Sequence, residues 1–184
     1  RSSDLVKAAM KSGKRAVCAG PGNPPVVVDE TADLEQAGRD IVHGASFDNN
    51  VICVDEKQVF VVESVGDELI AQMQRHGAHL VTGDQLSALE WLIFDGTPQP
   101  RRHATIDKKW VGKNADVILA EIGVRAAPGI RLAIARVPAE HPLVWSEQLM
   151  PVLPVVRVPD VETAIALAKE SEHGFGHSAS MHSR

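Results

Sequence analysis

Residues 26–63, VVVDETADLEQAGRDIVHGASFDNNVICVDEKQVFVVE, carry the pattern that decides the fold. Val26–Val28 predicts a short buried strand, and Gln58–Glu63 predicts a second strand. A helix is predicted between them, because apolar residues recur there at helical spacing and Thr31 or Asp33 can cap the first turn. The apolar face of that helix consists of Leu34, Ala37, Ile41, Val42 and Ala45. The stretch therefore predicts a strand, a helix and a second strand in succession.

The alternation of strands and helices continues over the rest of the chain. Further strands are predicted at Arg15–Cys18, Ala78–Thr82, Val117–Ala120, Arg131–Ala135, Leu153–Val158 and after Gly176. Further helices are predicted at Leu5–Ser12, Asp67–His76, Asp84–Phe94 and Val161–Ala168. Strands that alternate with helices indicate an α/β fold, with a largely parallel sheet flanked by helices.

The composition is ordinary for a globular domain and excludes several classes of function. With 184 residues, of which 44% are hydrophobic and 23% charged, the chain can form one domain with a substantial core. Its net charge of −5 gives no electrostatic basis for binding nucleic acid. No apolar run approaches the ~20 residues that a membrane span requires. Because 2 cysteines are too few for a disulfide scaffold, we expect a cytoplasmic protein.

Cys53 follows a polar, turn-prone run and precedes the predicted strand Gln58–Glu63. A cysteine at such a helix-to-strand junction can present its sulfur at the wall of a cleft, as a nucleophile requires. The alternative is a small buried thiol, because free cysteine is among the most buried residue types. Val51, Ile52 and Val54 flank Cys53 and predict an apolar pocket for a short aliphatic chain.

Two other motifs favour structural interpretations. Gly20-Pro-Gly22 predicts a tight turn rather than a dinucleotide-binding loop, because a third glycine and a following helix are missing. The histidines do not predict a metal site. Glycines between His173 and His177 break the spacing that would aim both rings at one ion, and no carboxylate or thiol nearby completes a ligand set. We expect His177 or His182 to line a polar pocket beside a strand end.

Glu147 lies in the stretch Trp145–Pro151, which predicts a loop at the edge of a cleft. An aromatic residue and apolar residues flank the acid there, so its carboxylate could accept hydrogen bonds from a pair of sugar hydroxyls. A solvated glutamate, or one at a helix start, is the alternative, and spacing alone does not decide between them.

Four stretches form a larger pattern: Gly22–Leu34, Ala45–Cys53, Ser146–Pro154 and Gly176–Ser183. Together they resemble the aldehyde dehydrogenase superfamily, and within it the CoA-acylating branch that contains the propionaldehyde and acetaldehyde dehydrogenases of bacterial propanediol and ethanolamine breakdown. The stretches occur in the family's order over essentially the whole chain. The resemblance implies that residues 1–184 form the catalytic thiol domain, and that a Rossmann-like cofactor domain is encoded elsewhere in a longer chain.

The resemblance also implies roles for individual residues. Cys53 matches the family's nucleophile, and its backbone amide would form half of an oxyanion hole whose other half is an asparagine outside this chain. Glu147 matches a glutamate that contacts the nicotinamide ribose, although Gln-Leu-Met-Pro follows it here instead of the Ile-Phe-Gly-Pro of hydrolytic members. The implied cofactors are NAD, with NADP not distinguished, and coenzyme A as co-substrate.

Ala19 is the informative departure from the hydrolytic pattern. Hydrolytic members carry a general-base glutamate three residues before the glycine that matches Gly22, and this chain has Ala19 there. Without that base, water attacks a cysteine thioester ~10²–10⁴-fold more slowly. A thiolate is intrinsically a better nucleophile than water, so the alanine favours transfer of the acyl group to CoA.

The implied partners are a short-chain aldehyde, with propionaldehyde favoured, coenzyme A and further copies of the chain in a homo-oligomer. Association with a bacterial microcompartment shell and its lumen is implied by the resemblance alone. One methylene is worth only ~1–3 kcal/mol of discrimination, so aldehydes of two and three carbons both remain candidates. Two alternatives stay open: a hydrolytic aldehyde dehydrogenase that forms the free acid, and a non-catalytic packing or oligomerisation domain with Cys53 buried.

Overall fold

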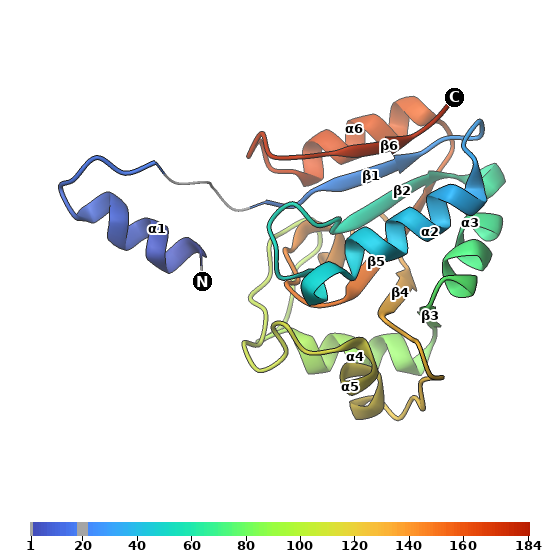
Figure 1. The fold of residues 1–184 in the computed structure, drawn as a ribbon, viewed down its shortest axis with the longest axis horizontal. Helices are drawn as coiled ribbons and strands as arrows, with labels where there is room; N and C mark the ends of the chain where they lie inside the picture. The colour runs from blue at the N-terminus through green and yellow to red at the C-terminus, as the bar shows by residue number, and fades with distance from the viewer. Residues whose placement is uncertain (1, 18–21) are drawn as a thin grey trace.

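The computed structural model describes residues 2–17 and 22–184, and within them a six-stranded sheet has the order β3-β4-β5-β2-β1-β6 (Figure 1). The strands are β1 (Pro25–Val28), β2 (Gln58–Val62), β3 (Ala78–Val81), β4 (Leu132–Arg136), β5 (Val152–Val158) and β6 (Ser180–His182). Every neighbouring pair of these strands runs parallel. The predicted α/β fold with a parallel sheet is confirmed.

Helices cover both faces of this sheet (Figure 1). They are α1 (Ser2–Lys11), α2 (Leu34–Ala45), α3 (Glu63–Arg75), α4 (Asp84–Ile93), α5 (Ala115–Glu121) and α6 (Val161–Ser171), with short 3₁₀ turns η1 (Phe47–Asn50) and η2 (Pro142–Trp145). The pair α2 and α3 packs on one face, α4, α5 and α6 lie on the other, and α1 stands apart from the sheet. No helix among the described residues has both the length and the apolarity needed to cross a membrane.

The strand sequences divide the core into two layers. Val26 and Val28 belong to the cluster packed under α2 and α3, whereas Val27 and Phe60 belong to the cluster packed under α4 and α6. Successive side chains of a strand point to opposite faces, so a strand covered on both sides must be apolar throughout. This requirement explains the uninterrupted apolar runs Val26–Val28 in β1 and Val59–Val62 in β2.

Aspartate side chains cap the starts of two helices. The Asp33 carboxylate accepts a hydrogen bond from the Gln36 amide at 3.1 Å, so Asp33 rather than Thr31 caps α2. The Asp160 carboxylate accepts from the Thr163 amide at 2.7 Å and caps α6. Each cap satisfies one of the amide groups that a helix start leaves without an internal partner.

Two predicted strands were wrong. Val117–Ala120 lies inside α5, where Ile118 is fully buried against the core. A short apolar run cannot be assigned to a strand or a buried helix from its composition, and the tertiary packing decided for the helix. Residues 15–17 form no strand and Val17 is 94% exposed, while Cys18 lies outside the described residues.

The contact between α2 and α3 depends on the absence of a side chain at Gly38. An added Cβ there would lie 2.6 Å from the Gln72 Cβ and 2.9 Å from the Gln72 carbonyl carbon. Gly→Ala inside a helix ordinarily stabilises by roughly 1 kcal/mol. We expect Gly38→Ala instead to lower the free energy of unfolding by ~1–3 kcal/mol, because the helices must separate.

A denaturant titration of the protein measures this change. The matched control is Glu35→Ala, which removes an exposed side chain from the same helix and should change the free energy of unfolding by less than about 1 kcal/mol. A Gly38→Ala protein more stable than the unchanged protein would contradict the close packing of α2 on α3.

Candidate active site

Four segments meet at one edge of the sheet because their strands are adjacent and parallel. Gly22, Cys53, Glu147 and His177 each precede a strand, namely β1, β2, β5 and β6. In the sheet these strands lie side by side in the order β5-β2-β1-β6. The amino ends of parallel strands lie at the same edge, so residues as much as 155 positions apart in sequence are brought into one site.

Residues 52–55 form a turn that carries Cys53, called the cysteine turn below. The chain enters this turn through an uncommon backbone conformation. Asp48, Asn49 and Asn50 have φ values of 43°, 55° and 61°. This left-handed region is rarely occupied by residues other than glycine, although Asn and Asp tolerate it best. Three such residues in succession reverse the chain after α2 and place Cys53 at the surface edge.

Cys53 occupies a tight turn closed by hydrogen bonds on both of its sides. The Asp55 amide donates to the Ile52 carbonyl at 3.2 Å, and the Ile52 amide donates to the Asp55 carboxylate at 3.1 Å. Burial raises the pKa of Asp55, and the nearby Lys57 ammonium opposes that rise. The Cys53 side chain keeps partial exposure. The interpretation of Cys53 as a sealed core thiol therefore does not fit the structure.

Lys57 lies beneath this turn and is completely buried, with 0% of its surface exposed. Its Nζ donates to the Asn50 carbonyl at 2.8 Å, to Asn50 Oδ1 at 2.5 Å and to the Ile52 carbonyl at 3.1 Å. The Asn50 amide group in turn donates to the carbonyls of Ala45 and Glu56 at 2.7 and 2.9 Å. Burial lowers the pKa of Lys57 to about 8, partly offset by the charges of Glu147 and other acids. A buried ammonium thus ties the turn to the start of β2.

A second loop supports the turn from outside. Asn49 Nδ2 donates to the Gly112 carbonyl at 3.1 Å and to Asn114 Oδ1 at 2.8 Å. The Gly112 amide donates to the Leu149 carbonyl at 2.9 Å. The cysteine turn, the irregular segment before α5 and the loop of Glu147 are therefore linked by hydrogen bonds.

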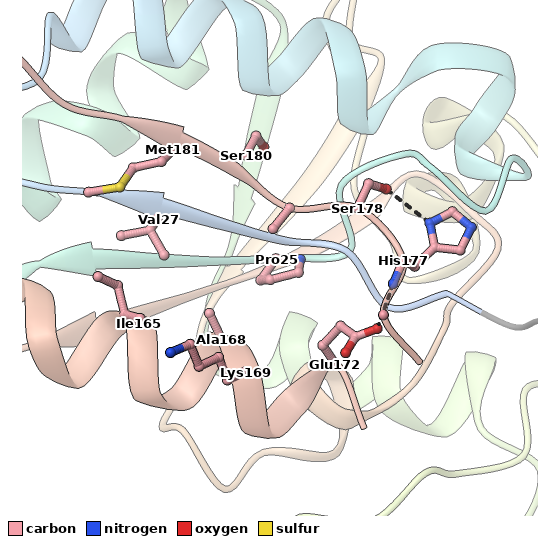
Figure 2. Close-up of a pocket in the computed structure, with 12 residues that line it drawn as sticks. Pro25, Val27, Ile165, Ala168, Lys169, Glu172, His177, Ser178, Ser180 and Met181 are labelled. Atoms are coloured by element: carbon pink, nitrogen blue, oxygen red, sulfur yellow. Dashed lines mark hydrogen bonds between the residues drawn. The ribbon is translucent and has the colours of Figure 1, made fainter. Parts of the chain in front are cut away.

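Gly22 and His177 form the wall next to Cys53. A Cβ on Gly22 would lie 2.5 Å from the Cys53 carbonyl oxygen and 3.2 Å from the His177 ring, so only glycine fits. The His177 amide donates to Glu172 Oε1 at 3.0 Å, and its ring Nδ1 lies 3.0 Å from Ser178 Oγ. Figure 2 shows these bonds at the end of a groove of about 350 Å³, with the ring turned away from Ile165.

The carboxylate of Glu147 lies in the same charged neighbourhood. Burial raises the pKa of Glu147, and the Lys57 ammonium, a backbone hydrogen bond from Gly22 and His177 act in the opposite direction. Glu147 is therefore coupled electrostatically to Lys57 and His177, and its role at the edge of a cleft stays a prediction.

The predicted apolar pocket residues are open on this chain. Val51 is 39% exposed and Val54 is 54% exposed, with Ile52 half-buried between them. Nearby Phe47 is 55% exposed as well. Exposed apolar side chains that lie together commonly mark a binding or contact surface. Because Val51 and Val54 are exposed, they can line a closed pocket only together with further atoms that cover them.

Sequence reasoning missed the buried polar residues that support the site. Asn23 Nδ2 donates to the Val144 and Ser171 carbonyls at 3.0 and 2.8 Å, and Gln58 Nε2 donates to the Asn23 carbonyl at 2.9 Å. The available signal was the pair Lys57–Gln58 immediately before an apolar strand, since polar side chains at a strand entry covered on both faces need buried partners.

The residues present fit only part of a nucleotide cofactor. Glu147 offers one half-buried carboxylate that can accept hydrogen bonds from ribose hydroxyls. Residues 22–24 lead directly into a strand at Pro25, without the helix start that cradles a pyrophosphate, and the rest of the predicted turn at Gly20–Gly22 lies outside the described residues. No group of three metal-ligating side chains occurs among the residues that the structure describes. Ala19, where hydrolytic members carry a base, lies outside the described residues.

The sequence and the fold of this chain are similar to those of known proteins. Residues 2–184 match the sequence profile of the aldehyde dehydrogenase family. The chain belongs to that family. It is 49% identical over 181 residues to the acetylating acetaldehyde dehydrogenase EutE of Salmonella typhimurium, an alignment that covers 98% of this chain.

Solved structures of family members have the same fold. One is a Rhodopseudomonas palustris propionaldehyde dehydrogenase with bound CoA and an acylated cysteine (TM-score 0.90, 43% identity, 98% of this chain and 40% of that chain). Another is a propionaldehyde dehydrogenase from the fucose utilisation microcompartment of Clostridium phytofermentans (TM-score 0.89, 38% identity, 98% and 40%). This chain of the aldehyde dehydrogenase family spans 38% of the length of EutE.

The close contact at Gly22 gives a test of the site geometry. We expect Gly22→Ala to push the Cys53 carbonyl or the His177 ring and to lower kcat by about 10–100-fold, because misplacing a reacting group by about 1 Å can cost 10²-fold. Steady-state oxidation of an aldehyde by the full-length protein, the activity proposed below, measures the effect. Gly96→Ala is the control, since an added Cβ at Gly96 meets no atom within 4 Å and any strain comes only from its own φ of 88°. Equal kcat losses in both variants would contradict a specific role for Gly22.

Proposed function

We propose that this chain is the catalytic thiol domain of a CoA-acylating aldehyde dehydrogenase that oxidises a short aliphatic aldehyde to acyl-CoA. The observation that carries the proposal is a partly exposed Cys53 on a turn fixed by Lys57, next to Gly22, Glu147 and His177. The acylated cysteine and bound CoA of the Rhodopseudomonas relative support the same chemistry.

The reaction begins with attack by the Cys53 thiolate on the aldehyde carbon. A carbon–sulfur bond forms and the carbonyl electron pair moves to oxygen, which gives a thiohemiacetal oxyanion. The backbone N–H of Cys53 belongs to the same residue as the attacking thiolate, and it can donate a hydrogen bond to that oxyanion. The proton lost by the thiol passes to a base or to solvent.

Oxidation needs a hydride acceptor next to the thiohemiacetal carbon. When bound, NAD(P) supplies that acceptor, and loss of the hydride converts the thiohemiacetal into a thioester of Cys53. Glu147 would contact the nicotinamide ribose and so orient the ring, whereas the other nucleotide contacts belong to a cofactor-binding part encoded with this domain in a longer chain.

The last step transfers the acyl group from sulfur to sulfur. The CoA thiolate attacks the thioester carbonyl, the bond to Cys53 breaks, and acyl-CoA leaves with the cysteine thiolate restored. Ala19 offers no carboxylate to activate water. Among the described residues, no acidic side chain forms a hydrogen bond with Cys53, and the Asp55 carboxylate is already engaged by the Ile52 amide. These features favour the thiol over water as the acceptor.

The substrate would lie against the apolar side chains around the nucleophile. Val51, Ile52 and Val54 would contact a short alkyl chain, with His177 on the polar side of the pocket. The propionaldehyde dehydrogenases among the relatives favour propionaldehyde. The exposed fractions of Val51 and Val54, 39% and 54%, leave surface for other parts of the protein to close the pocket.

We infer the setting of the protein from its relatives. A homo-oligomer in the cytoplasm, or in the lumen of a bacterial microcompartment in contact with its shell, would agree with the microcompartment origin of the Clostridium enzyme. No described helix could cross a membrane. Neither nucleic acid nor a lipid membrane is among the partners that we propose.

A product assay on the full-length protein tests the function. With propionaldehyde, NAD⁺ and CoA, we expect propionyl-CoA and NADH in equal amounts. Cys53→Ala should reduce NADH release by about 10³-fold or more, because the covalent step has no other nucleophile. Cys18→Ala is the matched control and should keep most of the activity. Full activity of Cys53→Ala, or free propionate formed whether or not CoA is present, would refute the proposal.

A second test concerns the missing base. We expect Ala19→Glu to raise the fraction of free acid at the expense of acyl-CoA, because a carboxylate at that position would deprotonate water and speed hydrolysis of the thioester by up to ~10²–10⁴-fold. Chromatographic quantification of both products at fixed CoA measures the ratio, and Ala19→Gln controls for side-chain size. An unchanged ratio in Ala19→Glu would show that the absent base does not select the product.

A further inference from the structure

The carbonyl of Ile52 receives two hydrogen bonds in the turn that carries the nucleophile. One comes from the Asp55 amide at 3.2 Å and the other from Lys57 Nζ at 3.1 Å. A carbonyl oxygen has two lone pairs, so this group is fully engaged. The Ile52 carbonyl thus has its direction fixed by a backbone donor and by a buried charge.

The same peptide group carries the amide of Cys53. In a trans peptide the C=O and N–H bonds are coplanar and point in opposite directions, and the described chain has no cis peptide. Lys57 is completely buried and draws the Ile52 carbonyl inward, so the Cys53 N–H points outward. No residue in 2–17 or 22–184 accepts a hydrogen bond from that N–H.

We propose that Lys57 is a positioning residue that aims and polarises the Cys53 N–H toward the oxyanion formed on the substrate. The inference rests on the proposed function, in which that N–H is an oxyanion-hole donor. A charged donor on the carbonyl draws electron density through the peptide and makes its N–H a stronger donor. Lys57 therefore acts through the Ile52–Cys53 peptide without touching the substrate.

The surroundings of Lys57 fit this role better than simple packing. Its three acceptors, two on Asn50 and one on Ile52, match the three protons of an ammonium group. Burying an ammonium is costly, and an apolar side chain of similar volume is often as stabilising. The lowered pKa of Lys57, about 8, reflects that cost. One of these three bonds reaches the peptide that carries the Cys53 amide, and the effect on that peptide is what the proposal assigns to the buried charge.

The experiment compares Lys57→Met with Lys108→Met in the full-length protein, since Lys108 is exposed and outside the site. We expect Lys57→Met to lower kcat for NADH release by about 10–100-fold, below the ~10²–10³-fold cost of deleting an oxyanion-hole donor. The aldehyde KM should change by less than about 3-fold, because the interaction is made mainly in the transition state. Lys108→Met should behave like the unchanged protein.

Thiol alkylation separates positioning from general damage. Iodoacetamide reacts with Cys53 without forming an oxyanion, so its rate constant at alkaline plateau pH should stay within about 3-fold in Lys57→Met. Parallel losses of kcat and alkylation, or a kcat within about 3-fold of the unchanged value, would overturn the inference. NADH is released whether the product is acyl-CoA or the free acid. The comparison of Lys57→Met with the unchanged protein can therefore be interpreted even if the product assay refutes CoA acylation.

A second variant covers the case in which Lys57→Met does not fold. Lys57→Gln keeps an N–H donor without the charge, and we expect its kcat to lie between those of Lys57→Met and the unchanged protein. In its acyl-enzyme, labelled with ¹³C at the acyl carbonyl, the infrared C=O stretch should move to higher wavenumber, because a weaker donor polarises the thioester less. An unshifted band in a folded Lys57→Gln protein would overturn the inference.

Discussion

Parallel pairing of β5, β2, β1 and β6 is the constraint on which the site depends, because it aligns the amino ends of four strands whose preceding segments carry Glu147, Cys53, Gly22 and His177. β5, β2 and β1 are covered on both faces, so their register is held by two apolar layers rather than by the loops. The loops therefore inherit their positions from a rigid sheet. A site built in this way can contain a thiol, a carboxylate and an imidazole without any local sequence motif.

Holding the nucleophile turn has an energetic cost that the surrounding structure offsets. The left-handed conformation of Asp48–Asn50 costs of order 1 kcal/mol per residue, and Lys57 loses the hydration of its charge. The compensation comes from bonds that only the folded chain provides, such as those from Asn49 to Gly112 and Asn114. Strain supported from two sides is typical of residues that must be presented in one orientation.

Most of the fold could be predicted because its physical signals are local. Val26–Val28 is an apolar run too short for a helix, and Asp33 supplies the oxygen that a helix start needs. The failure at Val117–Ala120 has a physical cause as well. Four apolar residues satisfy a strand or a buried helix equally, and the choice was made by burial of Ile118 against residues distant in sequence.

For the site, the sequence by itself determined which chemical groups the chain offers: one thiol in a turn-prone segment, apolar neighbours, and Glu147 and His177 before strands. It also determined the alanine at position 19, a covalent fact independent of folding. Only the tertiary structure decided that Lys57 is buried beneath the thiol and that Gly22 touches the Cys53 carbonyl. The physical reason is that burial and hydrogen-bond partners depend on which strands become neighbours, and strand order leaves no periodic trace in a sequence.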